Sequence, residues 1–127
     1  MNTQMIKVEA LPKTLHSHGV KTGNLIFTTG QLGRDPQTGE LADDIGKQTR
    51  QALNNLKTLA ESQGLTMDHV VRMTIYVANI EDVPHLNKVY FEEFFPVYRP
   101  ARTCVEVSRI AKNALLELDA VITCKED

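Results

Sequence analysis

The segment "VVRMTIYV", residues 70–77, decides the fold class because its side chains alternate in the manner of a β-strand. Successive side chains of a strand point to opposite faces of the sheet, so every second residue shares an environment. One set of positions is strongly apolar: Val71, Met73, Ile75 and Val77. The set between them is Arg72, Thr74 and Tyr76. The pattern predicts a strand with one face against the core.

A long amphipathic helix is predicted before this strand, over residues 44–63, because its apolar positions recur at helical spacing. Either Asp43 or Asp44 can cap its first turn, and Gly64 suits the left-handed conformation that ends a helix. A second helix is predicted after the strand, over 83–95, with Asp82 as its cap.

Five further strands complete the expected fold, and hairpins lie at both ends of the chain. These strands are expected at residues 5–9, 18–21, 25–32, 102–108 and 115–123. The order of elements favours an α+β protein with a mixed sheet of about six strands and both helices on one face. Residues 1–127 are expected to form a single domain, since the chain is too short for two ordinary ones.

Composition excludes several classes of function. The formal net charge of −2 gives no basic excess for a nucleic-acid surface. No apolar run approaches the roughly 20 residues that span a bilayer, and the first residues lack the apolar core of a signal peptide. We therefore expect a cytoplasmic protein with no nucleic-acid or membrane partner. Cys104 and Cys124 form no CxxC pair, so a zinc site is not expected.

The sheet face away from the helices is expected to be semi-polar. It should carry Arg72, Thr74, Tyr76, Arg102, Cys104, Glu106, Leu115, Glu117, Asp119 and Val121, with either Thr29 and Gln31 or Thr28 and Gly30. Apolar side chains on this face predict that another subunit covers it, because large exposed apolar patches usually mark an interface.

Arg102 and Glu117 are the strongest candidates for chemistry. If the last two strands pair antiparallel, both side chains can lie close together on the helix-free face. An arginine fork binds a carboxylate with two hydrogen bonds, and a nearby carboxylate can orient water or move a proton. The alternative is a plain salt bridge between Arg102 and Glu117.

Other candidates each have a structural alternative. Gly30, after Thr29, marks either a ligand contact or a plain bulge. Cys104 lacks a partner base, so its side chain is better interpreted as a small buried group, although its backbone N–H could bind a ligand. Asn87 can hold a loop or support a site. His16 can line a pocket or lie in an ordinary loop, and with no third ligand for His16 and His18 a metal site is not expected.

Three segments together resemble the reactive intermediate deaminase (Rid/YjgF, UK114-like) family. They are "GNLIFTTGQLGRDPQTGEL" (23–41), "NLKTLAESQGLTMDHVVRMTIYV" (55–77) and "RPARTCVEVSRIAKNALLELDAVI" (99–122). The resemblance implies a chorismate-mutase-like fold in a homotrimeric barrel with clefts between subunits. It also implies hydrolysis of enamines and imines, such as 2-iminobutanoate and 2-iminopropanoate, to 2-keto acids and ammonia without a cofactor.

By position, the resemblance assigns roles to individual residues. Arg102 matches the arginine that grips the substrate carboxylate, and Glu117 matches the acid that positions water. Cys104 and Gly30 match main-chain contacts to the ligand, and Asn87 matches a supporting polar residue.

Two positions depart from the family pattern. His16 stands where the archetypal deaminases have tyrosine, and Thr29 stands where they have serine. Both changes alter the substrate cleft, so a non-catalytic protein that binds a keto acid is the alternative function. An RNA-cleaving activity, which is attributed to some members of the family, is disfavoured by the net charge.

Overall fold

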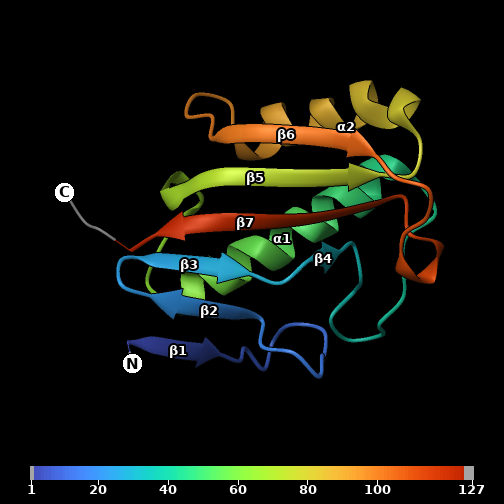
Figure 1. Cartoon of the computed structure of the whole chain (residues 1–127). Coiled ribbons are helices and arrows are strands. Elements are labelled where there is room, and N and C mark those ends of the chain that lie inside the picture. The colour runs from blue at the N-terminus through green and yellow to red at the C-terminus, as the bar shows by residue number, and fades with distance from the viewer. Residues whose placement is uncertain (1, 125–127) are drawn as a thin grey trace.

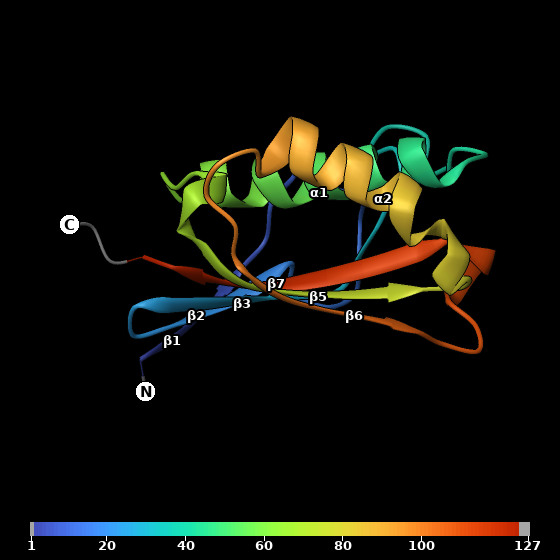
Figure 2. The same cartoon turned by 90° about the horizontal axis from the view of Figure 1, so that it is seen from above.

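The computed structural model describes residues 2–124 as one seven-stranded mixed sheet with two helices packed on one face (Figures 1 and 2). The strands are β1 (Thr3–Ile6), β2 (Gly19–Thr22), β3 (Leu25–Thr28), β4 (Gln31–Leu32), β5 (Val70–Val77), β6 (Ala101–Glu106) and β7 (Leu116–Thr123). The helices are α1 (Ile45–Ser62) and α2 (Val83–Val89). The α+β class and the placement of both helices are confirmed. The expected strand over 25–32 is instead two strands, because the chain leaves the ladder at Thr29 and Gly30.

The strand order is β1-β2-β3-β7-β5-β6, and β4 also pairs with β7. β7 is antiparallel to β3, β4 and β5, whereas β6 is parallel to β5 at the edge of the sheet. The last two strands are therefore not neighbours, and their expected antiparallel pairing is wrong. The connection through α2 returns the chain to the outer edge of β5 in the same direction, which is the usual geometry of a β-α-β crossover.

The core lies between the helices and the sheet. Leu53, Leu56 and Leu59 of α1 are fully buried, as are Met73 and Ile75 of β5. Val71 is exposed, contrary to expectation, because a bulge between Val70 and Arg72 shifts the alternation of β5 by one residue. Neither helix within residues 2–124 has the length and apolar character needed to cross a lipid bilayer.

The ends of the helices differ in how well local sequence predicted them. Asp44 caps α1, since its Oδ1 accepts a hydrogen bond from the Lys47 N–H at 2.8 Å. Gly64 adopts a φ of +73° just beyond the helix, as expected. Asp82 makes no side-chain capping bond in the described chain, because a 3₁₀ turn (Ile80–Asp82) already precedes α2. The predicted second helix changes after Val89 into a π-helical turn, η3 (Tyr90–Phe94).

Gly33 follows β4 and lies almost in contact with the backbone of α1 at Gln48. A Cβ atom at this position would lie 2.3 Å from the carbonyl oxygen of Gln48. A backbone oxygen in α1 cannot move aside without displacing the helix, so any side chain at this position forces the helix or the loop to shift.

We expect Gly33→Ala to lower the free energy of unfolding by about 1–3 kcal/mol, as overpacking of a filled site does. Gly46→Ala is the control, because Gly46 lies in α1 and its Cβ would meet only ordinary contacts. That change should be neutral or stabilising by up to about 1 kcal/mol through helix propensity. Urea denaturation measures both, and equal stability of the two variants would contradict the close approach.

Candidate functional site

Arg102 and Glu117, the residues expected to share a reaction centre, lie on opposite faces of the sheet. In the parallel register Arg102 pairs with Met73, whose side chain is fully buried beneath the helices. Paired residues share a face, so Arg102 points toward the helices. Glu117 pairs with Tyr76 on β5 and is flanked along β7 by fully buried leucines, so it points to the open face.

The expectation that Arg102, Cys104 and Glu106 lie on the open face is therefore wrong. Thr103 and Val105 occupy that face instead, and Val105 is exposed there. β6 is an edge strand, and its helix-facing positions are half buried at Arg102 and Cys104 and exposed at Glu106, so they tolerate polar side chains. Apolar alternation alone could not distinguish its two faces.

The guanidinium of Arg102 is held by side chains from α2 and η3. Its Nη2 donates a hydrogen bond to Oδ1 of Asn87 at 2.7 Å. Its central carbon lies 4.7 Å from the ring centroid of Tyr90 and 5.4 Å from that of Phe91. Its Nη1 is buried and has no hydrogen-bond partner among the described residues. The expected alternative, a salt bridge to Glu117, is wrong, and a donor is left that suits an anion.

Cys104 follows Arg102 on the same face and is half buried. Burial raises the pKa of its thiol, and the charge of Arg102 opposes this rise. A thiol with a raised pKa is a poor nucleophile at neutral pH, so Cys104 fits the structural interpretation of its side chain better than a catalytic one.

Glu117 lies against the break between β3 and β4. A Cβ atom at Gly30 would overlap its carboxylate, so the absent side chain of Gly30 makes room for Glu117. Burial raises the pKa of Glu117, and the nearby charge of Asp119 raises it further. Burial also raises the pKa of Asp119, against a hydrogen bond from Tyr76 that lowers it. This carboxylate pair therefore holds protons more tightly than exposed carboxyls do.

A cavity of about 340 Å³ brings together four of the predicted residues: His16, Thr29, Gly30 and Glu117. Lys13, Arg34 and Lys112 also line it, and sequence reasoning missed all three. They come from separate loops and carry no local motif that would have linked them.

Both ring nitrogens of His18 face backbone groups. His18 is buried, with Nδ1 accepting a hydrogen bond from the Val8 N–H and Nε2 placed to donate to the Pro12 carbonyl, both at 2.9 Å. Residues 2–124 contain no group of three or more His, Cys, Asp or Glu side chains that could hold a metal ion.

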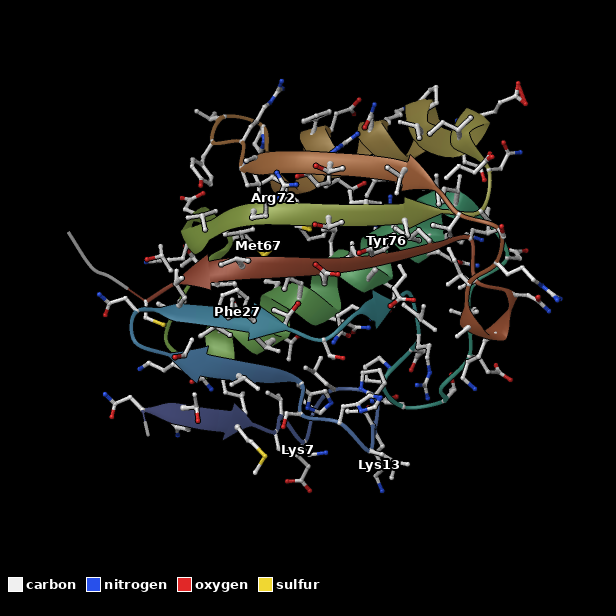
Figure 3. The ribbon with its side chains drawn as sticks, viewed as in Figure 1. Lys7, Lys13, Phe27, Met67, Arg72 and Tyr76 are labelled. Carbon is white, nitrogen blue, oxygen red and sulfur yellow. The ribbon has the colours of Figure 1, made fainter. Side chains whose placement is uncertain are left out.

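The open face carries an apolar row across four strands. Met5, Val20, Phe27 and Val121 occupy paired positions on β1, β2, β3 and β7. Figure 3 shows Phe27 on this face with Arg72 and Tyr76, and 47% of the Phe27 surface is exposed. Leu115, also expected on this face, packs against the core instead. Gln31 is likewise buried, opposite Leu118.

Comparison with known proteins adds an independent line of information. Residues 7–124 match the family model described as Endoribonuclease L-PSP. A RutC family protein of Pyrococcus abyssi is 39% identical over 95% of this chain and 97% of its own length. The 2-iminobutanoate/2-iminopropanoate deaminase of Escherichia coli K12 is 36% identical over 94% of this chain and 96% of its own length.

Solved structures show the same fold. The crystal structure of E. coli TdcF with bound serine superposes with a TM-score of 0.88 at 32% identity, covering 94% of this chain and 98% of TdcF. The E. coli YjgF gene product gives a TM-score of 0.88 at 33% identity, covering 96% of this chain and 99% of that protein.

The raised pKa of Glu117 predicts a pH-dependent stability. Above the ordinary carboxyl value the unfolded chain loses this proton before the folded one, so stability falls as pH rises until the folded group also ionises. Glu117→Gln has no carboxyl at this position, so its stability lacks this decrease with rising pH. We expect the stability of the variant relative to the native protein to increase as pH rises above the ordinary carboxyl value of 4.5.

Urea denaturation at fixed protein concentration provides the measurement, with Glu61→Gln on the exposed side of α1 as the control. A stability difference for Glu117→Gln that stays constant or decreases with pH would show that burial does not disfavour the carboxylate.

Proposed function

This chain belongs to the Rid/YjgF family, and from that premise we propose that it hydrolyses 2-imino acids to 2-keto acids and ammonia. The substrates we propose are of the 2-iminobutanoate and 2-iminopropanoate type. The support at family level is the E. coli relative that bears this activity in its name. The solved TdcF structure contains serine, which is also a small molecule with a carboxylate.

The observation that carries the proposal is the free nitrogen of Arg102. A guanidinium with a buried, unpartnered Nη1 gains most from an anion that restores its hydrogen bonding. A substrate carboxylate supplies such an anion and forms a charge-assisted hydrogen bond. Asn87 then holds the other side of the guanidinium, and the backbone at Cys104 lies one step along the same face.

Glu117 is the proposed acid and base. Its raised pKa lies closer to neutrality than that of an exposed carboxyl, which favours both accepting and returning a proton. Water attacks the imine carbon and gives a proton to Glu117, while the C=N electron pair moves to nitrogen, which takes that proton from Glu117. The hydroxyl of the resulting carbinolamine then gives its proton to Glu117 as C=O forms. The C–N bond breaks, and the leaving nitrogen takes the proton from Glu117 and departs as ammonia. These steps need no cofactor.

One chain cannot place Arg102 and Glu117 around one small acid, because the sheet itself separates them. We therefore propose a cleft between two copies, with Arg102 reaching from the edge strand of one copy toward the open face of the next. A rotationally closed assembly repeats that contact around a ring, and the proposed assembly is a homotrimer with three clefts. The apolar row of Met5, Val20, Phe27 and Val121 supplies surface for burial between copies.

His16 and Thr29 form part of the proposed cleft wall. Both line the cavity that contains Glu117, so they contact the part of the substrate remote from its carboxylate. The alternative function is a keto-acid binding protein that uses the same cleft without turnover. The two differ in whether keto acid accumulates faster in the presence of the protein.

Arg102→Ala is expected to reduce imine hydrolysis by about 100-fold or more, because the substrate loses its anchor and orientation. The assay generates 2-iminobutanoate in situ and follows keto-acid release, and light scattering checks that the assembly is intact. Arg50→Ala is the control, since Arg50 pairs with Glu93 on the helix surface. An Arg102→Ala variant that keeps native activity would contradict the carboxylate clamp. Native protein that binds 2-oxobutanoate without accelerating hydrolysis would favour the binding-protein alternative.

Mixing two inactive variants tests whether the site spans two copies. Arg102→Ala and Glu117→Gln are unfolded together in equal amounts and refolded. If each site takes Arg102 from one copy and Glu117 from its neighbour, random assembly restores about a quarter of the native sites. Each variant refolded separately is the control. Assembled mixtures with no recovered activity would contradict a site that takes Arg102 and Glu117 from two copies.

A further inference from the structure

Arg102 is stacked on aromatic rings that the family resemblance does not mention. We propose that Tyr90, supported by Phe91, is a positioning residue that fixes the plane of the Arg102 guanidinium so that Nη1 is aimed at the substrate carboxylate. This inference rests on the proposed function, because it assumes that Arg102 binds that carboxylate.

A single hydrogen bond does not fix a guanidinium. The bond from Nη2 to Asn87 restrains one corner of the group but leaves it free to pivot about that contact. The Tyr90 ring, 4.7 Å from the guanidinium carbon, adds a flat surface that restrains the plane. Cations are attracted to an aromatic face within about 6 Å, and the attraction is stronger when both groups are removed from water.

The Tyr90 ring is itself rigidly held. Only 1% of its surface is exposed. Its ring packs edge-on against Phe91 at a centroid distance of 5.0 Å and tilted against Phe95 at 4.7 Å. A ring that cannot move keeps the guanidinium in a fixed plane. This matters because a small displacement of the guanidinium would misorient the bound substrate.

The π-helical turn explains how two consecutive aromatic residues reach the same arginine. The N–H of Phe95 donates to the carbonyl of Tyr90 at 2.9 Å, a spacing of five residues. This wider turn places both Tyr90 and Phe91 near Arg102, and single π turns inside helices are frequent at functional sites. Phe91 also stacks under Arg99 at 4.3 Å.

The ring face of Tyr90, and not its hydroxyl, carries the proposed role. Burial raises the pKa of Tyr90 to about 12, although the nearby guanidinium of Arg102 opposes this rise, so the phenol is neutral near pH 7. The hydroxyl is buried and lies near Arg102, but it forms no hydrogen bond of acceptable geometry among the described residues. Removing the hydroxyl therefore leaves the cation–π contact in place.

The test compares binding of 2-oxobutanoate with binding of its uncharged methyl ester by calorimetry. Tyr90→Leu should weaken binding of the acid by about 3- to 30-fold, the range expected for a cation–π contact, with little change for the ester. Tyr90→Phe should bind the acid with the same affinity as the native protein, because it keeps the aromatic ring. Phe94→Leu is the matched control, because Phe94 lies in the same π turn and packs against the core.

Three results would overturn the positioning role. The first is native affinity for the acid in Tyr90→Leu while Arg102→Ala loses it. The second is a loss in Tyr90→Phe as large as in Tyr90→Leu, which would assign the effect to the hydroxyl. The third is an equal loss for acid and ester, which indicates a general packing defect. Native affinity for the acid in Arg102→Ala would instead refute the underlying carboxylate clamp.

Phe91→Leu keeps the proposal testable if Tyr90→Leu does not fold. Phe91 is only half buried and lies 5.4 Å from the guanidinium carbon, so its truncation perturbs the core less. It should produce a smaller loss that is again selective for the acid. No selective loss in this variant would overturn the proposal.

Discussion

The parallel pairing of β6 with β5 places Arg102 opposite Met73 and beneath α2. The antiparallel pairing of β7 with the other side of β5 turns Glu117 to the open face. Because one sheet separates a cation from an acid, the proposed site is divided into two half-sites. Completing a site from both halves requires a second copy, so catalysis and assembly are coupled in the proposed mechanism.

The two half-sites differ in their electrostatics. Arg102 lies among aromatic rings and one amide, where little water competes for its free donor. Glu117 lies beside Asp119 on a partly buried surface, which raises the pKa of both carboxyls. In the proposed complete site, a nearby guanidinium would lower the pKa of Glu117, whereas an anionic substrate would raise it. The protonation of Glu117 therefore depends on whether substrate is bound.

The description of the family model names an endoribonuclease. Binding of an RNA backbone is mainly electrostatic and needs several phosphate contacts. The net charge of this chain is −2, and the free donor of Arg102 is buried beside aromatic rings. A small acid fits this donor better than a polyanionic strand does, which is the reason for proposing imine hydrolysis.

Local sequence determined the elements whose signals are local. The alternation of residues 70–77, the apolar stripe of α1, its cap at Asp44 and the left-handed Gly64 all follow from short-range sterics and hydrogen bonding. The family resemblance, carried by whole segments, singled out Arg102, Asn87, Gly30 and Glu117 before any contact was known.

Only the tertiary structure decided which strands are neighbours, since pairing joins segments far apart in the chain. It also decided the face of β6, because a half-covered edge strand has no clear apolar side. The π turn at Tyr90 was equally hidden, because the pattern of residues 83–95 fits an ordinary helix.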